Sequence, residues 1–210
     1  MTARSQDAED VALLVRWRGG DVAAGEALTR RSFRMVLRFF DTKAPAAALD
    51  LTQQTFLALA EGRGRAEIRT SFRAYLLGIA RYTLIAHLRH HYRAPGTFEP
   101  GHSSILDALP DPASSPTARL QDHQQRAQVV HALRRLPLDH QIALEMHYWN
   151  ELSIAEIAAV LDCTPGSIKA RLFRARKALQ AAVADLNAGA APPLDRLEHE
   201  LSSVAKDAET

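Results

Sequence analysis

The chain has 210 residues, of which 47% are hydrophobic, 24% charged and 6% aromatic, and its formal net charge is +2. This composition is ordinary for a folded, mostly helical protein, and it excludes collagen-like and wholly disordered chains. A single cysteine, Cys163, excludes an internal disulfide and a cysteine-rich zinc finger, and no apolar run approaches the roughly 18–20 residues of a membrane span. Because the N-terminus is polar and carries acids, it does not resemble a signal peptide, and we expect a cytoplasmic protein.

Four helices are predicted in the N-terminal part of the chain, and no segment has the alternating pattern of a strand. The first is short and closes at Gly19, and Asp21 can cap the second, whose apolar residues recur at helical spacing. After Pro45, a third helix is predicted over about 46–61 and a long fourth one over about 72–91. The fourth helix is apolar on more than one side, so we expect it to pack between neighbours.

The charge distribution and the prolines divide the chain into modules. Residues 61–93 hold seven Lys and Arg against two Asp and Glu, whereas 94–123 is acidic and contains five prolines. This predicts a domain over 8–93, a flexible acidic linker over 94–123, a second domain over 124–186 and a tail over 187–210. In the tail, Leu194, Leu197, Leu201 and Val204 recur at helical spacing, which favours one or two amphipathic turns.

The second domain contains two consecutive helices with clear start signals. Ser153 and Glu156 match a capping box, in which each side chain accepts the other residue's backbone N–H. After the turn 162–164, Pro165 stands at the first position of a helix predicted over 165–182. A short capped helix, a short turn and a second helix are typical of a helix-turn-helix.

The second of these helices separates apolar from basic residues. Ile168, Leu172, Ala175 and Leu179 fall within one stripe, and residues 167–177 contain five basic side chains and no acid. The small residues at its start would let such a helix enter a DNA major groove. The alternative is a helical hairpin with a solvated basic face.

Three segments together resemble one protein family. LRRLPLDHQIALEMHYWNELSIAEIAAVLDCTPGSIKARLFRARKAL, 133–179, resembles the second DNA-binding domain of the extracytoplasmic-function (ECF) group of bacterial sigma factors. DLTQQTFLAL, 50–59, is similar to the polymerase-binding helix of that family, and FRAYLLGIARYTLIAHLRHHYR, 72–93, to the helix that faces its −10 promoter element. The resemblance implies an all-α fold of two small helical domains, which direct core RNA polymerase to promoters without catalysing a bond change.

The resemblance also implies functional residues. Contacts to core polymerase are expected from Asp50, Gln53, Gln54, Phe56 and Leu57, although core packing is an equal alternative for Leu57. Contacts to the melted −10 strand are expected from Arg63, Arg65, Arg69, Arg73, Tyr75, Arg81, Tyr82, Arg89 and Arg93. Contacts to the −35 duplex are expected from Thr164, Pro165, Gly166, Ser167, Lys169, Arg171, Phe173, Arg174 and Lys177. Promoter DNA and core polymerase are the expected partners, and an anti-sigma factor is left open.

Three positions depart from the family's usual residues, and two of them, Tyr82 and Ala86, motivate an alternative. Tyr82 replaces a common Asn, Ala86 a frequent Asp and Tyr75 a common Trp, so a degenerate decoy or adaptor is one alternative. A helix-turn-helix regulator that binds duplex DNA without polymerase is another.

Enzymatic alternatives are disfavoured by the residues around the two candidate motifs. His87, His90 and His91 could chelate a metal, but no acid lies near them in the sequence, and we expect no metal and no cofactor. The segment 62–65 lacks the lysine and the preceding strand of a phosphate-binding loop.

Overall fold

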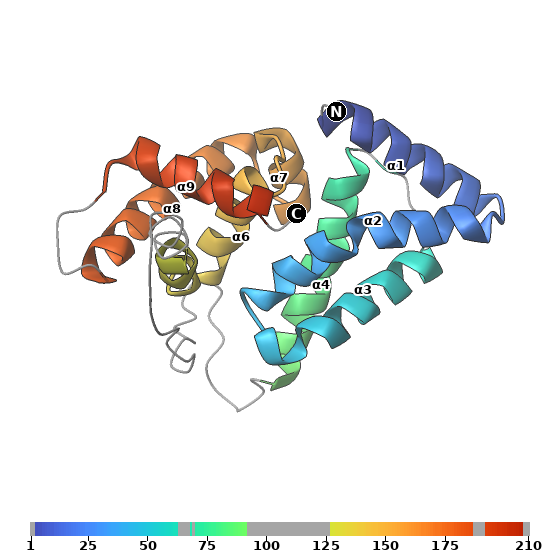
Figure 1. The fold of residues 1–210 in the computed structure, drawn as a ribbon, viewed down its shortest axis with the longest axis horizontal. Helices are drawn as coiled ribbons and strands as arrows, with labels where there is room; N and C mark the ends of the chain where they lie inside the picture. The colour runs from blue at the N-terminus through green and yellow to red at the C-terminus, as the bar shows by residue number, and fades with distance from the viewer. Residues whose placement is uncertain (1–2, 63–67, 69, 92–126, 187–191, 208–210) are drawn as a thin grey trace. The chain divides into compact units, whose positions relative to one another are not determined.

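The computed structural model describes residues 3–62, 68, 70–91, 127–186 and 192–207, and within these ranges the regular structure is helical. Residues 127–134 form one helix. The others are α1 (Ala3–Arg18), α2 (Val22–Asp41), the short 3-10 helix η1 (Pro45–Ala47), α3 (Ala48–Gly62), α4 (Phe72–His91), α6 (Leu138–Tyr148), α7 (Ile154–Leu161), α8 (Pro165–Leu186) and α9 (Leu194–Asp207) (Figure 1). The predicted all-α class is confirmed.

Contacts divide the chain into two compact units. One comprises residues 1–95 with 151–164, and the other comprises 96–150 with 165–210. The first unit therefore holds α1 to α4 and α7, and the second holds α6, α8 and α9. The predicted linker, 94–123, lies outside the described residues, and the predicted domain limits stay a prediction.

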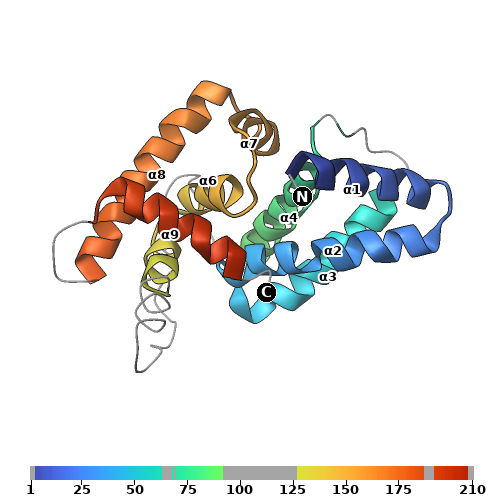
Figure 2. The same cartoon turned by 45° about the horizontal axis from the view of Figure 1, so that its top comes forward.

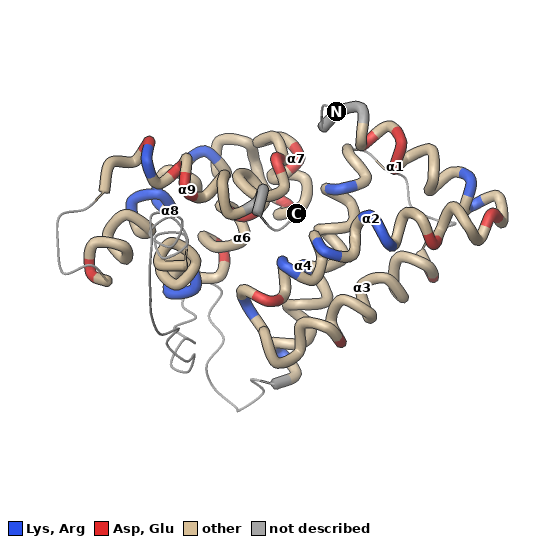
Figure 3. The backbone as a smooth tube through the Cα atoms, viewed as in Figure 1, with Lys and Arg blue, Asp and Glu red and all other residues tan. Residues whose placement is uncertain are grey.

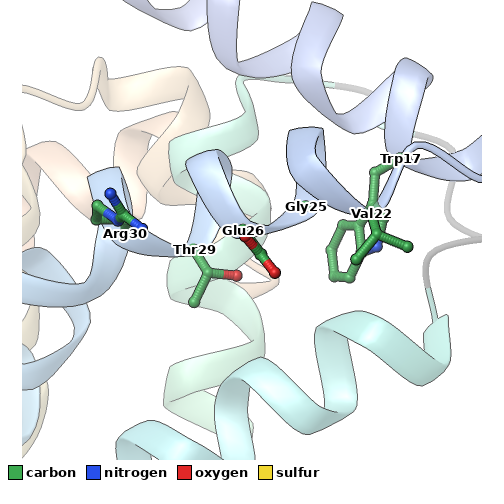
Figure 4. Close-up of a pocket in the computed structure, with 6 residues that line it drawn as sticks. All are labelled: Trp17, Val22, Gly25, Glu26, Thr29 and Arg30. Carbon is green, nitrogen blue, oxygen red and sulfur yellow. The ribbon is translucent and has the colours of Figure 1, made fainter.

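The α1–α2 corner of the first unit depends on a cap and on a close helix approach. The side chain of Asp21 accepts the backbone N–H of Ala24 at 3.1 Å, which confirms the predicted cap of α2. Gly25 faces Trp17, and a Cβ atom there would lie 2.5 Å from the indole ring. Figure 4 shows Trp17 beside Val22 at one end of the hollow along this part of α2. Only a residue without a side chain allows α2 to lie this close to the indole.

The long helix α4 begins with two hydrogen bonds at its N-terminus. Ser71 Oγ accepts the N–H of Ala74 at 3.2 Å, and Asp7 of α1 accepts the N–H of Phe72 at 2.8 Å. These acceptors satisfy backbone donors that have no partner within the first turn. Several apolar side chains around α4 are fully buried: Phe72, Leu76, Leu77, Ala80 and Leu84. The predicted packing of this helix between neighbours is confirmed.

The second unit packs α6, α8 and α9 together. Along α8 the buried residues form one stripe: Ile168, Leu172, Ala175, Leu179 and Val183. Apolar residues of α6 and α9 are buried in the same unit: Ile142, Leu144, Met146, Leu197 and Leu201. Gln141 donates from Nε2 to the carbonyl oxygens of Leu136 (2.9 Å) and Arg134 (3.0 Å), which fixes the chain before α6.

Two helices are longer than the sequence pattern indicates. Helix α1 begins at Ala3, well before its apolar residues. Its early turns are held by Asp7, which accepts a hydrogen bond from α4, and by Asp10, which forms an ion pair with Arg31 of α2. The tail forms 14 helical residues instead of one or two turns, because Leu197 and Leu201 are buried in the second unit. In both cases the deciding contacts come from residues distant in sequence, so local periodicity does not contain them.

Candidate nucleic-acid interface

The start of α7 and the turn after it are defined by local hydrogen bonds. Ser153 Oγ accepts the N–H of Glu156 at 3.3 Å, and the Glu156 carboxylate accepts the N–H of Ser153 at 2.8 Å, so the predicted capping box is present. Burial raises the pKa of Glu156, but the hydrogen bonds from Ser153 and Ser71, together with the charge of Arg73, outweigh burial, and the net shift of the pKa is downward. Asp162, at φ 52°, ends α7 in a left-handed conformation that Asp tolerates, and α8 begins three residues later.

Helix α8 presents most of the predicted −35 residues to solvent. Figure 3 marks basic residues along α8 in blue. The exposed residues at its start and along one side are Thr164, Pro165, Gly166, Ser167, Lys169, Ala170, Phe173, Arg174 and Lys177. Phe173 is 55% exposed, and the Lys177 ammonium lies 4.8 Å from the centre of its ring. The exposed face therefore combines three cations with one large apolar side chain, Phe173.

Two arginines of the same basic run point elsewhere. Arg171 is half-buried, with Nη1 3.7 Å from the Asp139 carboxylate on α6. Arg176 donates from Nε to the Tyr148 hydroxyl at 2.7 Å and lies 2.9 Å from Glu198 on α9. The sequence pattern counts both arginines in the basic run 167–177, but it does not reveal Asp139, Tyr148 or Glu198 as their partners, because these residues belong to other helices.

His140 on α6 lies near this face. Burial lowers the pKa of its imidazole, and the positive charges of Arg174 and Arg171 lower it further, whereas Asp139 acts in the opposite direction. The neutral form of His140 is therefore favoured beside the basic side of α8.

The residues predicted to contact the −10 strand lie only partly within the part of the chain that the structure describes. Arg63, Arg65, Arg69 and Arg93 lie outside the described residues. On α4, Tyr82 is 75% exposed and Arg89 is also exposed.

The remaining three described members of the −10 set are less accessible. Arg73, Tyr75 and Arg81 are half-buried on α4. Burial raises the pKa of the Tyr75 hydroxyl. Tyr82 is thus the aromatic side chain of α4 that is best placed to meet an external base.

Helix α3 exposes nearly all of the predicted polymerase-binding residues. Asp50, Gln53 and Gln54 face solvent, and Gln54 Nε2 donates to the Asp50 carboxylate at 2.7 Å. Leu57 is 60% exposed, so core packing, the alternative for this residue, is wrong. Phe56 is half-buried, and its ring is stacked on that of Phe33 at a centroid distance of 6.2 Å.

Other site types find little support in the described part of the chain. Among its residues, no three His, Cys, Asp or Glu side chains are grouped as metal ligands. None of its helices is both long and apolar enough to cross a bilayer. The hollow of about 410 Å³ beside α2 is lined by Trp17, Val22, Gly25, Glu26, Thr29 and Arg30 (Figure 4).

Comparisons with known proteins agree with this geometry. The family model for sigma-70 region 2 matches residues 26–94, and that for sigma-70 region 4 matches 126–179. The ECF RNA polymerase sigma factor SigC of Mycobacterium tuberculosis is 33% identical over 183 residues, which cover 86% of this chain and 95% of the relative. The chain belongs to the ECF group of sigma factors. The RNA polymerase sigma-H factor of Pseudomonas aeruginosa is 29% identical, and the alignment covers 85% of this chain and 95% of that protein.

A solved structure supports the same assignment. The sigma factor RpoE of Bartonella quintana, crystallised with the anti-sigma factor NepR, is 25% identical and covers 78% of this chain and 96% of its own, with a TM-score of 0.56. In this sigma factor, region 2 contains α3, α4 and most of α2, and region 4 contains the helix-turn-helix. Helix α9 lies beyond both matched regions.

Proposed function

We propose that this sigma factor reads the −35 element with α8, captures the melted −10 strand with residues of 62–93, and docks on core polymerase through α3. The observation that carries the proposal is the separation of faces on α8. Its apolar stripe is buried, while Lys169, Arg174 and Lys177 are exposed on the other side. No chemical step is required, since the work consists of binding and of positioning DNA.

The exposed face of α8 has the properties that major-groove reading needs. Gly166, Ser167 and Ala170 are small, so the backbone can approach the bases closely. Arginine can form paired hydrogen bonds with guanine, and lysine and arginine both bind phosphates. Arg174 is our candidate for a base contact, and Lys177 for a phosphate contact.

The N-terminal unit offers different chemistry, suited to a single strand. The segment 61–93 is strongly basic, and both Tyr82 and Arg89, about two turns apart on α4, are exposed. A cationic track with an accessible aromatic ring is the usual means of binding unpaired bases. This supports strand capture by region 2.

An anti-sigma factor is a further proposed partner. The sigma factor of Bartonella quintana was solved in complex with one, and it shares 25% identity with this chain. We also propose that this chain acts in the bacterial cytoplasm, where core polymerase is found.

Run-off transcription with purified core polymerase tests the proposal. Initiation at a selected promoter is the expected result. Polymerase binding without initiation would instead indicate a decoy or adaptor. Tight, specific duplex binding by the chain alone, with no effect of polymerase, would indicate a plain helix-turn-helix regulator. The chain alone is expected to bind duplex weakly, because its net charge is only +2.

A further inference from the structure

Helix α9 is packed into the second unit through one apolar face. Leu197 and Leu201 are each 1% exposed, and Leu194 and Val204 are half-buried. The helix contacts both α6 and α8, and Figure 2 shows it lying across them. Where the chain enters α9, Gln180 of α8 donates from Nε2 to the carbonyl of Pro192 at 2.7 Å. Helix α9 is therefore packed into the core of the second unit, although it lies outside the residues matched by the region 4 model.

A polar cluster, the Arg176 clasp, ties the same three helices together. We define it as Tyr148 of α6, Arg176 of α8 and Glu198 of α9. Arg176 Nε lies 2.7 Å from the Tyr148 hydroxyl and 2.9 Å from the Glu198 carboxylate. The guanidinium carbon lies 5.6 Å from the centre of the Tyr148 ring.

The geometry of α8 links this clasp to the DNA face. Successive residues of an α-helix are turned by about 100°, so the side chains of Arg174 and Arg176 leave α8 on opposite sides. Arg174 is exposed, whereas the side chain of Arg176 is 27% exposed and held by the clasp. The buried stripe sets the rotation of α8 about its axis, and a contact that holds Arg176 on the side opposite Arg174 adds to that constraint.

We infer that Arg176 is a positioning residue and not a DNA contact, and that Glu198 on the tail helix holds it in that role. This inference rests on the proposed reading of the −35 element by α8. It makes α9 a permanent part of the promoter-reading unit. The opposing possibility is that Glu198 masks a cation which would otherwise bind a phosphate.

Salt dependence separates these two roles. Each phosphate contact adds about 0.9 to the steepness with which log affinity falls against log salt concentration. We would measure promoter binding by the full chain assembled with core polymerase, over a salt series, for Glu198→Gln and Arg176→Ala. Glu200→Gln is the matched control, because it removes an equal charge from α9 where the partner is Arg196, at 3.0 Å on the same helix.

The expected result is that Glu198→Gln and Arg176→Ala each weaken binding about threefold to tenfold with the salt slope unchanged. Glu200→Gln should stay close to wild type. Tighter binding by Glu198→Gln with a steeper slope, or a slope lowered by about one in Arg176→Ala, would overturn the inference. If the wild-type chain binds no promoter with polymerase, the proposed function fails.

A second measurement tests the clasp without DNA. Hydrogen exchange of the free full chain should show faster exchange of backbone amides in α8 and α9 for Glu198→Gln than for Glu200→Gln. Equal exchange in the two variants would overturn the positioning role, whatever the outcome with promoter DNA.

Discussion

Helices α4 and α8 both carry rows of basic residues, yet they present them differently. On α8 the apolar residues form one stripe, and Lys169, Arg174 and Lys177 stand exposed on the other side. On α4, apolar residues are buried on more than one side, and two of its cations, Arg73 and Arg81, are half-buried, while Tyr82 and Arg89 are exposed further along the helix. A helix that enters a groove needs one clear face along its length, which α8 has, whereas α4 exposes candidate contact residues only in its second half.

The largest effect is expected for the predicted −10 arginines that precede α4 in the sequence. Arg63→Ala combined with Arg65→Ala should reduce run-off transcription from duplex promoters by at least about tenfold, because extruding a base costs a few kcal/mol that cationic contacts must offset. A template with a pre-melted bubble should restore much of the activity. An equal defect on both templates would assign these arginines to docking or to general phosphate binding.

The next effect tests whether α8 reads bases. Arg174→Ala should cost about 1–3 kcal/mol of promoter binding and change the preferred −35 sequence, as expected for a side chain that contacts a base edge. Lys177→Ala, also exposed on α8, should weaken all sequences alike and lower the salt slope by about one. Competition among a set of −35 variants measures both effects. No change after Lys169→Ala combined with Arg174→Ala would refute the DNA face.

The sequence predicts more of the candidate site on α8 than on α4. For α8, the capping box, Pro165 and the apolar stripe are local signals, and the structure confirms the helix start and the buried stripe. For α4, the helix limits are local, but whether Arg73 or Tyr75 is accessible depends on the helices packed around it. The partners of Arg171 and Arg176, which are Asp139, Tyr148 and Glu198, lie between 22 and 32 residues away in sequence. No helical period can reveal such contacts.

The third prediction concerns α3, which like α8 shows one exposed face. Leu57→Ala should weaken binding to core polymerase by about 1 kcal/mol and leave the melting temperature nearly unchanged, because the side chain is 60% exposed. Leu49→Ala is the matched control, since it is 56% exposed on the same helix and outside the predicted polymerase set. Titration with labelled core enzyme and a thermal melt give the two quantities. A large drop in melting temperature in Leu57→Ala but not in Leu49→Ala would contradict the prediction, because it would assign the weaker polymerase binding to a loss of stability.

A fourth prediction concerns the capping box of Ser153 and Glu156 at the start of α7. Ser153→Ala removes the acceptor for the N–H of Glu156 and the donor to its carboxylate, so it should destabilise the protein by about 1 kcal/mol. Ser153→Asp should retain most of the stability, because an aspartate also caps a helix N-terminus. Urea unfolding of the three proteins measures the effect. Equal loss in both variants would show that the hydroxyl acts through some other contact.

The smallest expected effect is a pH dependence of protein stability that comes from His140 on α6, near the basic side of α8. Burial and the nearby charges of Arg174 and Arg171 lower the pKa of His140, so the folded state binds its proton less readily than the unfolded state does. This contribution to stability is full above the unfolded pKa, near 6.5, and is lost as the pH falls toward the folded pKa. Wild type should therefore lose slightly more stability between pH 7.5 and pH 5.5 than His140→Gln does. The fluorescence of Trp149, which is 5% exposed after α6, reports on this unit when Trp17 is replaced by Phe. Equal losses in the two proteins would show that Asp139 offsets the two arginines and that the imidazole does not sense the basic face of α8.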